Sequence, residues 1–365
     1  MDRRDAPRYS EAMKAMMIYN PVAGQRDMAD ELRQVIAYLE GQRWEVTLRR
    51  TLGPGDATTY AREAVVHGFD MAIAVGGDGT LGQVATGLAG SRCILGVLPV
   101  GTGNVWAHML GLPQWSPLSP RTTLLDAARV LVEGEVHAVD LGMAGDRYFM
   151  LWAGIGFDAQ VTRGVEPHRE IRRSLGNLTY VIATIALSLG LRGTRVTVTI
   201  DGRSMRQRLI MAVVSNAQLY GPTVRLAPQA QIDDGELDVY LFKGDNLLDG
   251  VRHLASVLVG RHHRNPKVAI YRARHVALHA ARPLPVHLDG EPIGYTPVSI
   301  SVAPRALRVI VPSWASGSLF TDGGGAEEAS LARRIAERLR AQRERWHEEA
   351  ERLQQDWERV IGRSG

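Results

Sequence analysis

Cysteine is nearly absent from this chain of 365 residues, because Cys93 is the only one. No internal disulfide bond can form, and such usage favours a reducing compartment. Long apolar runs are lacking as well, since the longest, residues 180–191, is too short to span a bilayer. Residues 1–5 are mostly charged and lack the apolar core of a secretory signal. We therefore expect a soluble, cytoplasmic protein.

Negative charge is missing from two long intervals. No carboxylate occurs between Asp78 and Asp126, which suits this stretch to receiving an anion. None occurs in residues 250–288 either, although that stretch has six arginines and one lysine. Residues 1–170 have 16 basic and 20 acidic side chains, whereas residues 171–325 have 18 and 10. The basic second half indicates an anionic partner, such as phosphate groups, an acidic membrane surface or nucleic acid, or simply a solvated basic face.

Two glycine-rich turns form the centre of the sequence. The apolar runs Met71–Val75 and Ile94–Leu98 end in Gly76-Gly-Asp-Gly-Thr80 and Pro99-Val-Gly-Thr-Gly-Asn104. Apolar runs of about five residues that end at glycines predict buried parallel strands. The turns then lie at the carboxyl ends of the strands, where open α/β sheets bind ligands. Glycine lets backbone N–H groups approach a phosphate, and a helix beginning at Thr80 would direct its positive end there.

Strands that alternate with helices predict a doubly wound parallel sheet in the first third of the chain. The expected strands are 15–19, 44–48, 71–75 and 94–98, and the expected helices are 27–42, 56–67, 80–88, 105–111 and 123–133. Short β-rich runs follow, which is the pattern of an antiparallel sandwich or barrel. The expected runs are 136–143, 148–153, 195–200, 206–214, 237–242, 268–270, 276–279, 286–288, 298–302 and 307–311, with helices at about 175–191 and 247–259.

The chain is expected to have three parts. Residues 1–134 form the α/β domain with the parallel sheet, and residues 135–322 form the β-rich sandwich domain. Residues 323–365 are a glycine linker and a charged, amphipathic helical tail. The apolar stripe of that helix suits packing on the body, a coiled coil or a membrane surface. Its first half is basic and its second half acidic, so antiparallel pairing between two copies is one hypothesis.

The spacing Gly77-x-Gly79-x-x-Gly82 by itself matches the fingerprint of dinucleotide-binding proteins. That interpretation requires an acidic residue about twenty positions later, which would bind a ribose hydroxyl. The acid-free interval after Gly79 lacks one. The sequence therefore argues against a hydride-transferring dehydrogenase.

The fuller string Gly76-Gly-Asp-Gly-Thr80 resembles the phosphate-binding signature of the superfamily of diacylglycerol kinases, sphingoid-base kinases, NAD kinases and phosphofructokinases. The turn at 99–104 narrows the resemblance to the lipid-kinase branch. Asn20-Pro-Val-Ala-Gly24, Asp233-Asp-Gly-Glu-Leu-Asp238 and Leu288-Asp-Gly-Glu291 also match, in the order of the family. The resemblance covers about 15–312 and is strongest to bacterial diacylglycerol kinase-like proteins. It implies a nucleotide-binding catalytic domain followed by a lipid-substrate domain.

The resemblance implies ATP and Mg²⁺ as cofactors. The implied nucleotide-binding residues are Asn20, Pro21, Gly24, Thr51, Gly76, Gly77, Asp78, Gly79, Thr80, Gly101, Thr102 and Asn104. Asp78 is itself negative and so does not attract phosphate. By the resemblance it is a catalytic residue that holds Mg²⁺ or the substrate hydroxyl, and the alternative is that it caps the following helix.

Two later acidic motifs are further candidates. Asp289 and Glu291 follow a long basic interval, and a carboxylate among cations in a cleft suits accepting a hydroxyl proton. The resemblance makes this the general-base motif, with Glu291 favoured and Asp289 supporting it. A hairpin turn with an Asp-Gly signal is the alternative. The resemblance also implies a structural Mg²⁺ site of Asp234 and the carbonyls of Gln231 and Glu236, whereas a polar turn entering a strand is the alternative.

We therefore expect an ATP-dependent kinase that phosphorylates a lipid hydroxyl, of the diacylglycerol or sphingoid-base kind, at the inner face of the membrane. Nucleic acid is not an expected partner, because the basic residues are not interleaved with aromatics. A homodimer through the C-terminal helix is a further hypothesis. Gly82, Gln83 and Val105 depart from the family pattern, which leaves a non-catalytic lipid- or nucleotide-binding protein as an alternative. An NAD kinase is the other, although Ser215-Asn-Ala217 lacks the acid of that family's Asn-Glu pair.

Overall fold

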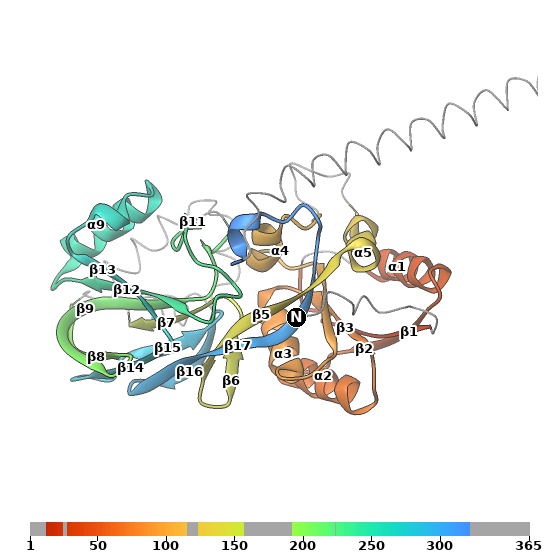
Figure 1. The fold of residues 1–365 in the computed structure, drawn as a ribbon, viewed down its shortest axis with the longest axis horizontal. Coiled ribbons are helices and arrows are strands. Elements are labelled where there is room, and N and C mark those ends of the chain that lie inside the picture. The colour runs from red at the N-terminus through yellow and green to blue at the C-terminus, as the bar shows by residue number, and fades with distance from the viewer. Residues whose placement is uncertain (1–11, 25–27, 115–122, 157–191, 223, 322–365) are drawn as a thin grey trace, which may run out of the picture.

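The computed structural model describes residues 12–24, 28–114, 123–156, 192–222 and 224–321 (Figure 1). The helices expected at 175–191 and in the C-terminal tail lie outside these residues. Among the described helices, none combines the length and the apolar character that crossing a bilayer requires.

The first part of the chain is an α/β domain with a parallel sheet, as expected. Its strands run side by side in the order β4, β3, β1 and β2. They are β1 (Met13–Tyr19), β2 (Trp44–Arg50), β3 (Met71–Gly76) and β4 (Ile94–Pro99). The helices are α1 (Ala29–Gly41), α2 (Asp56–Val66), α3 (Asp78–Leu88), α4 (Val105–Leu110) and α5 (Leu124–Glu133).

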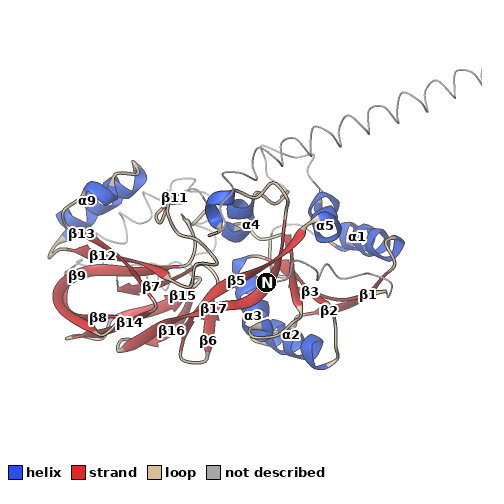
Figure 2. Ribbon diagram, viewed as in Figure 1, coloured by secondary structure: helices blue, strands red, loops and turns tan. Residues whose placement is uncertain are grey.

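Burial on both faces explains why the strands of this sheet are continuously apolar. Every residue of β3 is buried, because α1 and α5 pack together on one side of the sheet and α2 and α3 on the other (Figure 2). The covering helices are amphipathic: α1 buries Leu32, Val35 and Leu39, which lie on one face at helical spacing. The four parallel strands therefore end at one common edge.

The second part is β-rich and mainly antiparallel, which confirms the expected fold class. Its strands are β5 (Glu135–Ala144), β6 (Arg147–Phe149), β7 (Trp152–Gly156), β8 (Thr194–Ile200), β9 (Arg203–Ser215), β10 (Leu219–Tyr220), β11 (Val224–Arg225), β12 (Leu237–Lys243), β13 (Val268–Ala273), β14 (His275–Ala280), β15 (Pro285–Leu288), β16 (Glu291–Tyr295) and β17 (Val298–Val311). The helix α9 (Leu247–Leu258) and two short 3₁₀ turns, His262–Arg264 and Gly317–Leu319, complete it.

Strand β17 joins the two parts into one continuous sheet. It pairs with β14 and β5 in antiparallel fashion and then with β4 in parallel, where Arg308 lies opposite Ile94. The sequence predicted two separate strands here, 298–302 and 307–311. The structure has one strand with an irregularity between Ala303 and Leu307. The returning chain therefore fixes the β-rich part against the edge of the parallel sheet.

A buried carboxylate holds this irregularity in place. Asp140 of β5 is fully buried, and its two oxygens accept hydrogen bonds from the backbone N–H of Arg305 and of Gly235, both at 2.6 Å. Burial raises the pKa of Asp140, whereas these two bonds act in the opposite direction. Arg305 has a φ of +50°, so the strand bends where its amide turns to Asp140.

Candidate active site

The two glycine-rich turns lie against each other at the carboxyl ends of β3 and β4. A Cβ atom on Gly101 would lie 2.5 Å from the Cα of Gly77, which is closer than any side chain can approach. The N–H of Val100 donates to the carbonyl of Gly76 at 3.1 Å. Glycine is therefore required at 101, because the two backbones pass each other at contact distance.

Asp78 connects the first turn to the second. It is the first residue of α3, and its carboxylate accepts hydrogen bonds from the N–H groups of Val105 (3.0 Å) and Trp106 (3.2 Å). These amides are in the first turn of α4 and have no partner within that helix. Asp78 thus caps α4, the helix after the second turn, and not the helix that it begins. Burial raises the pKa of this carboxyl.

The ends of β1 and β2 contribute to the same edge. The side-chain amide of Asn20 donates to the Thr80 hydroxyl at 2.9 Å, and its Oδ1 accepts from the N–H of Val22 at 3.1 Å. Thr51 is buried just beyond β2, and its N–H donates to the carbonyl of Tyr19. Residues that were predicted from four separate stretches therefore lie together.

Asn104 presents a polar atom to the space between the turns. Its φ is +45°, and its side-chain amide donates to the carbonyl of Gly101 at 2.8 Å and to Gln114 at 3.2 Å. Its Oδ1 is buried, and no donor of the described residues reaches it. A small cavity lies beside it, lined in part by Gly76, Gly77 and Asp78. A buried acceptor without a partner is costly, so a bound ligand with a donor group would stabilise it.

A second hollow, of about 270 Å³, lies over β8, β14 and β17, and no carboxylate is among its lining residues.

The downstream acidic motif is a β-hairpin that also holds a carboxylate, that of the partly buried Asp289. Asp289 and Gly290 have φ values of +48° and +90° and form the two-residue turn between β15 and β16. Asp289 accepts hydrogen bonds from three consecutive amides, those of Met150 (2.7 Å), Leu151 and Trp152 (both 2.9 Å). The single strand predicted at 148–153 is therefore divided into β6 and β7, because these amides turn towards Asp289.

Burial raises the pKa of Asp289 to about 6. The three amides stabilise the charged form and act against burial, whereas the Asp78 carboxylate raises the pKa further. A Cβ atom on Gly82 of α3 would lie only 3.4 Å from Oδ2 of Asp289.

Glu291 lies over the first turn of α3 and is held by side chains. Its Oε2 pairs with Arg147 at 2.7 Å, and its Oε1 accepts from Gln83 at 3.0 Å. A Cβ atom on Gly79 would lie 3.5 Å from Oε1, and the Glu291 side chain is 36% exposed. No pattern in the sequence points to Arg147, which lies 144 positions from Glu291, and Gln83 stands out in the sequence only as a departure from the family pattern.

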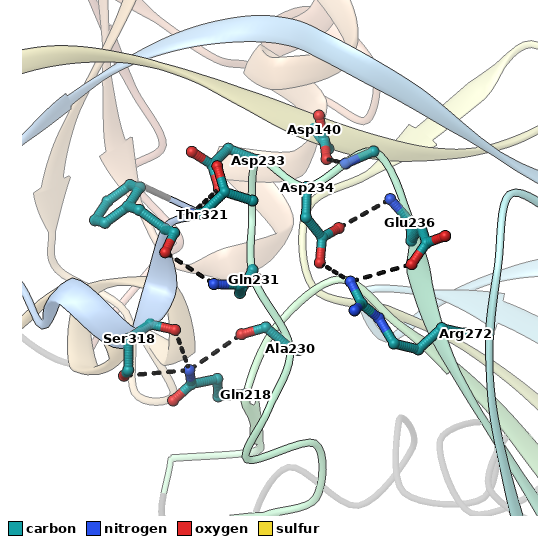
Figure 3. A network of polar contacts seen from close by, with 12 residues as sticks. Asp140, Gln218, Ala230, Gln231, Asp233, Asp234, Glu236, Arg272, Ser318 and Thr321 are labelled. Atoms are coloured by element: carbon teal, nitrogen blue, oxygen red, sulfur yellow. Dashed lines mark hydrogen bonds and ion pairs between the residues drawn. The ribbon is translucent and has the colours of Figure 1, made fainter. Parts of the chain in front are cut away.

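The Asp234 loop contains an ion pair where the sequence predicted a metal (Figure 3). Oδ1 of Asp234 accepts from the N–H of Glu236 at 2.9 Å, and Oδ2 pairs with the guanidinium of Arg272. Arg272 also pairs with the Glu236 carboxylate at 3.2 Å. The side chain of Gln231 donates to the carbonyl of Phe320 at 2.8 Å.

As arranged, this loop does not present an open ligand set to Mg²⁺. Both oxygens of Asp234 have protein partners, and a guanidinium faces the two carboxylates. The Asp78 oxygens are likewise occupied by backbone amides. Over the described residues, no group of three or more His, Cys, Asp and Glu side chains could hold a metal ion. The Mg²⁺ sites stay a prediction.

Two family models match this chain. Residues 14–144 match the diacylglycerol kinase catalytic domain, and residues 152–311 match the YegS C-terminal NAD kinase beta sandwich-like domain. A diacylglycerol kinase of Bacillus subtilis (strain 168) is 32% identical over 301 residues, which are 82% of this chain and 96% of that protein. One of Staphylococcus carnosus (strain TM300) is 27% identical over 82% of this chain and 95% of that protein. A crystal structure of a diacylglycerol kinase from Bacillus anthracis (strain Sterne) is 25% identical, covers 82% of this chain and 96% of that one, and superposes with a TM-score of 0.66.

Gly101→Ala should destabilise the fold, because its Cβ would collide with the Cα of Gly77. Overpacking of this kind costs about 1 to 3 kcal/mol, to be measured as a loss in the free energy of unfolding by urea. Gly41→Ala is the matched control, since nothing lies within 4 Å of a Cβ there and its φ is not positive. Equal stability of the two variants would contradict the close approach of the turns.

Asp289 should make stability depend on pH. Because its pKa is raised, the neutral carboxyl is favoured in the folded state, and its stabilising contribution is complete at low pH. That contribution is lost as the pH rises through about 6. Between about pH 4 and pH 7, wild type should therefore lose roughly 2 kcal/mol of unfolding free energy relative to Asp289→Asn. Urea unfolding across this range measures the difference, and parallel curves would contradict it.

The Arg272 ion pairs should stabilise the Asp234 loop without a metal. Arg272→Gln leaves two facing carboxylates without a cation and should cost about 1 kcal/mol, or a few degrees in Tm, whereas Arg272→Lys should cost less. EDTA should leave the Tm of wild type unchanged. If EDTA lowers that Tm and Arg272→Gln does not, a metal site is the correct interpretation of this loop.

Proposed function

Because the chain belongs to the diacylglycerol kinase family of lipid kinases, we propose that it transfers the γ-phosphate of ATP to the hydroxyl of a diacylglycerol-like or sphingoid-base-like lipid. One observation carries this proposal: Glu291 lies over the first turn of α3, the helix that begins in the first glycine turn. Phosphoryl transfer to an alcohol needs a carboxylate that can accept the hydroxyl proton close to a turn that binds the phosphates, and both lie at the first turn of α3.

ATP is proposed to bind at the common edge of β1 to β4. Backbone N–H groups of the two turns would receive its phosphates, since glycine lets them approach closely and α3 directs its positive end there. The buried Oδ1 of Asn104, which no donor of the described residues reaches, supports a ligand between the turns. The full proposed set is Asn20, Pro21, Gly24, Thr51, Gly76, Gly77, Asp78, Gly79, Thr80, Gly101, Thr102 and Asn104.

Glu291 is the proposed general base. The substrate hydroxyl gives its proton to the Glu291 carboxylate while its oxygen forms a bond to the γ-phosphorus. The bond from that phosphorus to the bridging oxygen breaks, and ADP leaves with the electron pair. Glu291 suits this role better than Asp289, whose oxygens already accept three amide hydrogen bonds. Asp289 supports Glu291 by holding the hairpin in place.

Asp78 is proposed to act mainly by fixing the two turns relative to each other, because both of its oxygens accept amides of α4. Mg²⁺, which the family resemblance implies, would neutralise charge on the phosphates when bound. The proposed proton transfer to Glu291 does not depend on the position of that ion. Charge stabilisation by the protein would come from the backbone amides of both turns.

The proposed division is a nucleotide-binding catalytic domain over 1–134 and a lipid-substrate domain over 135–322. The structure favours a lipid kinase over an NAD kinase, because the side-chain NH2 of Asn216 is occupied elsewhere and Ala217 follows it in place of an acid. The Asn216 side chain is buried and donates to the carbonyls of Asp140 (3.0 Å) and Met150 (3.1 Å). Peripheral contact with an anionic membrane surface, where the lipid substrate resides, is part of this proposal.

Glu291→Gln should lower turnover of diacylglycerol by about a hundredfold to ten-thousandfold, because the amide cannot accept the hydroxyl proton. ATP binding, measured by equilibrium dialysis, should be unchanged. Radiolabelled ATP with diacylglycerol in mixed micelles measures turnover.

The control for this experiment is Glu63→Gln on α2. Glu63 pairs with Arg49, and its side chain is 36% exposed, the same as that of Glu291. It should retain full turnover. If Glu291→Gln also keeps full turnover, the assignment of the base is wrong; if it loses ATP binding, Glu291 acts on the nucleotide instead.

A further inference from the structure

Helix α9 packs on the β-rich domain with a side on which the two buried residues are polar and Val257 is partly buried against the core. Of its twelve residues, Asp249 and His253 are the buried ones. Asp249 accepts hydrogen bonds from Lys267 Nζ at 2.6 Å and from the N–H of Asp245 at 3.1 Å. His253 hydrogen-bonds to the carbonyl of Lys243 at 2.7 Å. These polar contacts fix which side of the helix faces inward.

The apolar side of α9 faces outward as a consequence. Leu248, Val251 and Leu258 are each about half exposed, and Val259, just after the helix, is 67% exposed. Their spacing of three, seven and one residues places them along one side of a helix. An amphipathic helix on a globular domain ordinarily buries such a stripe, and an aligned exposed stripe marks an interaction surface.

The surroundings of this stripe are positively charged. Arg252 lies on the exposed part of α9, and Arg261 and Arg264 follow it, all exposed. The acids nearest in sequence are already paired: Asp249 with Lys267, and Asp245 with Arg208. An apolar stripe bordered by arginines, whose nearest acids in the sequence are both paired, is complementary to the headgroups and acyl chains of an anionic bilayer.

We propose that the outer face of α9, comprising Leu248, Val251, Arg252, Leu258 and Val259, docks on an anionic membrane surface. This inference rests on the proposed function, because it supplies the contact through which a lipid kinase meets its substrate. The docking face is connected to the active site by packing: α9 contacts β11, β11 pairs with β10, and β10 contacts α4, whose first amides bind Asp78. In Figure 1, α9 and α4 both lie along the upper edge of the molecule.

The single cysteine of the chain makes a direct test possible. Cys93 is buried, so Val259→Cys in the full chain can be labelled selectively with an environment-sensitive fluorophore. Vesicles of phosphatidylcholine and phosphatidylglycerol should shift the emission to the blue, whereas vesicles of phosphatidylcholine alone should shift it less. Val66→Cys is the matched control, since Val66 ends α2 and is 80% exposed, and it should show no shift.

Three outcomes would overturn the proposal. A probe at 259 that does not respond to anionic vesicles removes the membrane as the occupant. A blue emission that needs no vesicles but rises with protein concentration identifies a second copy of the chain. A blue emission that appears without vesicles and does not change with protein concentration indicates that another segment of the same chain covers α9.

A second experiment separates docking from catalysis. Leu258→Asp should reduce co-sedimentation with the anionic vesicles by about tenfold, and Val66→Asp, also at the last residue of a helix, should not. Both variants should phosphorylate a short-chain diacylglycerol in detergent micelles as wild type does. If Leu258→Asp binds vesicles like wild type, docking by α9 is wrong while the lipid-kinase function stands. If wild type binds vesicles through α9 but phosphorylates no lipid, the proposed function fails and the docking face stands.

Discussion

The burial of one carboxylate, Asp289, on three consecutive backbone amides organises the centre of this molecule. The three hydrogen bonds offset part of the cost of burying the charge, and they attach the hairpin that carries Asp289 to the chain at 150–152. Those amides separate β6 from β7, and Arg147 in β6 then reaches Glu291, two residues after Asp289. The position of Glu291 over α3 therefore follows from how Asp289 is satisfied.

Each carboxylate of the site is compensated in a different way, and this difference supports the proposed roles. Asp78 and Asp289 have backbone amides as partners, whose positions the fold fixes. Glu291 has side-chain partners, Arg147 and Gln83, and remains partly exposed. A group that must take up a proton during a reaction needs access and some freedom, whereas a group that fixes two turns needs neither. One type of side chain thus serves two purposes because its partners differ.

The sequence predicted the local features well, since local physics determines them. Buried parallel strands must be apolar on both faces, and backbones in contact require glycine, so β3, β4 and the turns at Gly77 and Gly101 were evident. Features that depend on distant pairing were not evident. The junction of β17 with β4 and the pair of Arg147 with Glu291 join residues more than 140 positions apart, and no periodicity records such contacts. For α9, the periodicity predicted the helix but not which side is buried, because the inward side is fixed by Lys267 and Lys243 on other segments.

The arginines of the acid-free interval from 250 to 288 lie in two different environments. In the sequence, this interval only made the Asp-Gly-Glu motif that follows it conspicuous, because the motif's acids come after a long basic stretch. In the structure, Arg272 faces inward to the carboxylates of Asp234 and Glu236 and balances their charge. Arg252, Arg261 and Arg264 face outward beside the apolar stripe of α9. An acidic residue among the three exposed arginines would weaken their attraction to an anionic surface. An additional acidic residue near Arg272 would compete with Asp234 and Glu236 for its guanidinium. The same absence therefore bears on the ion pairs of Arg272 and on the proposed docking face of α9.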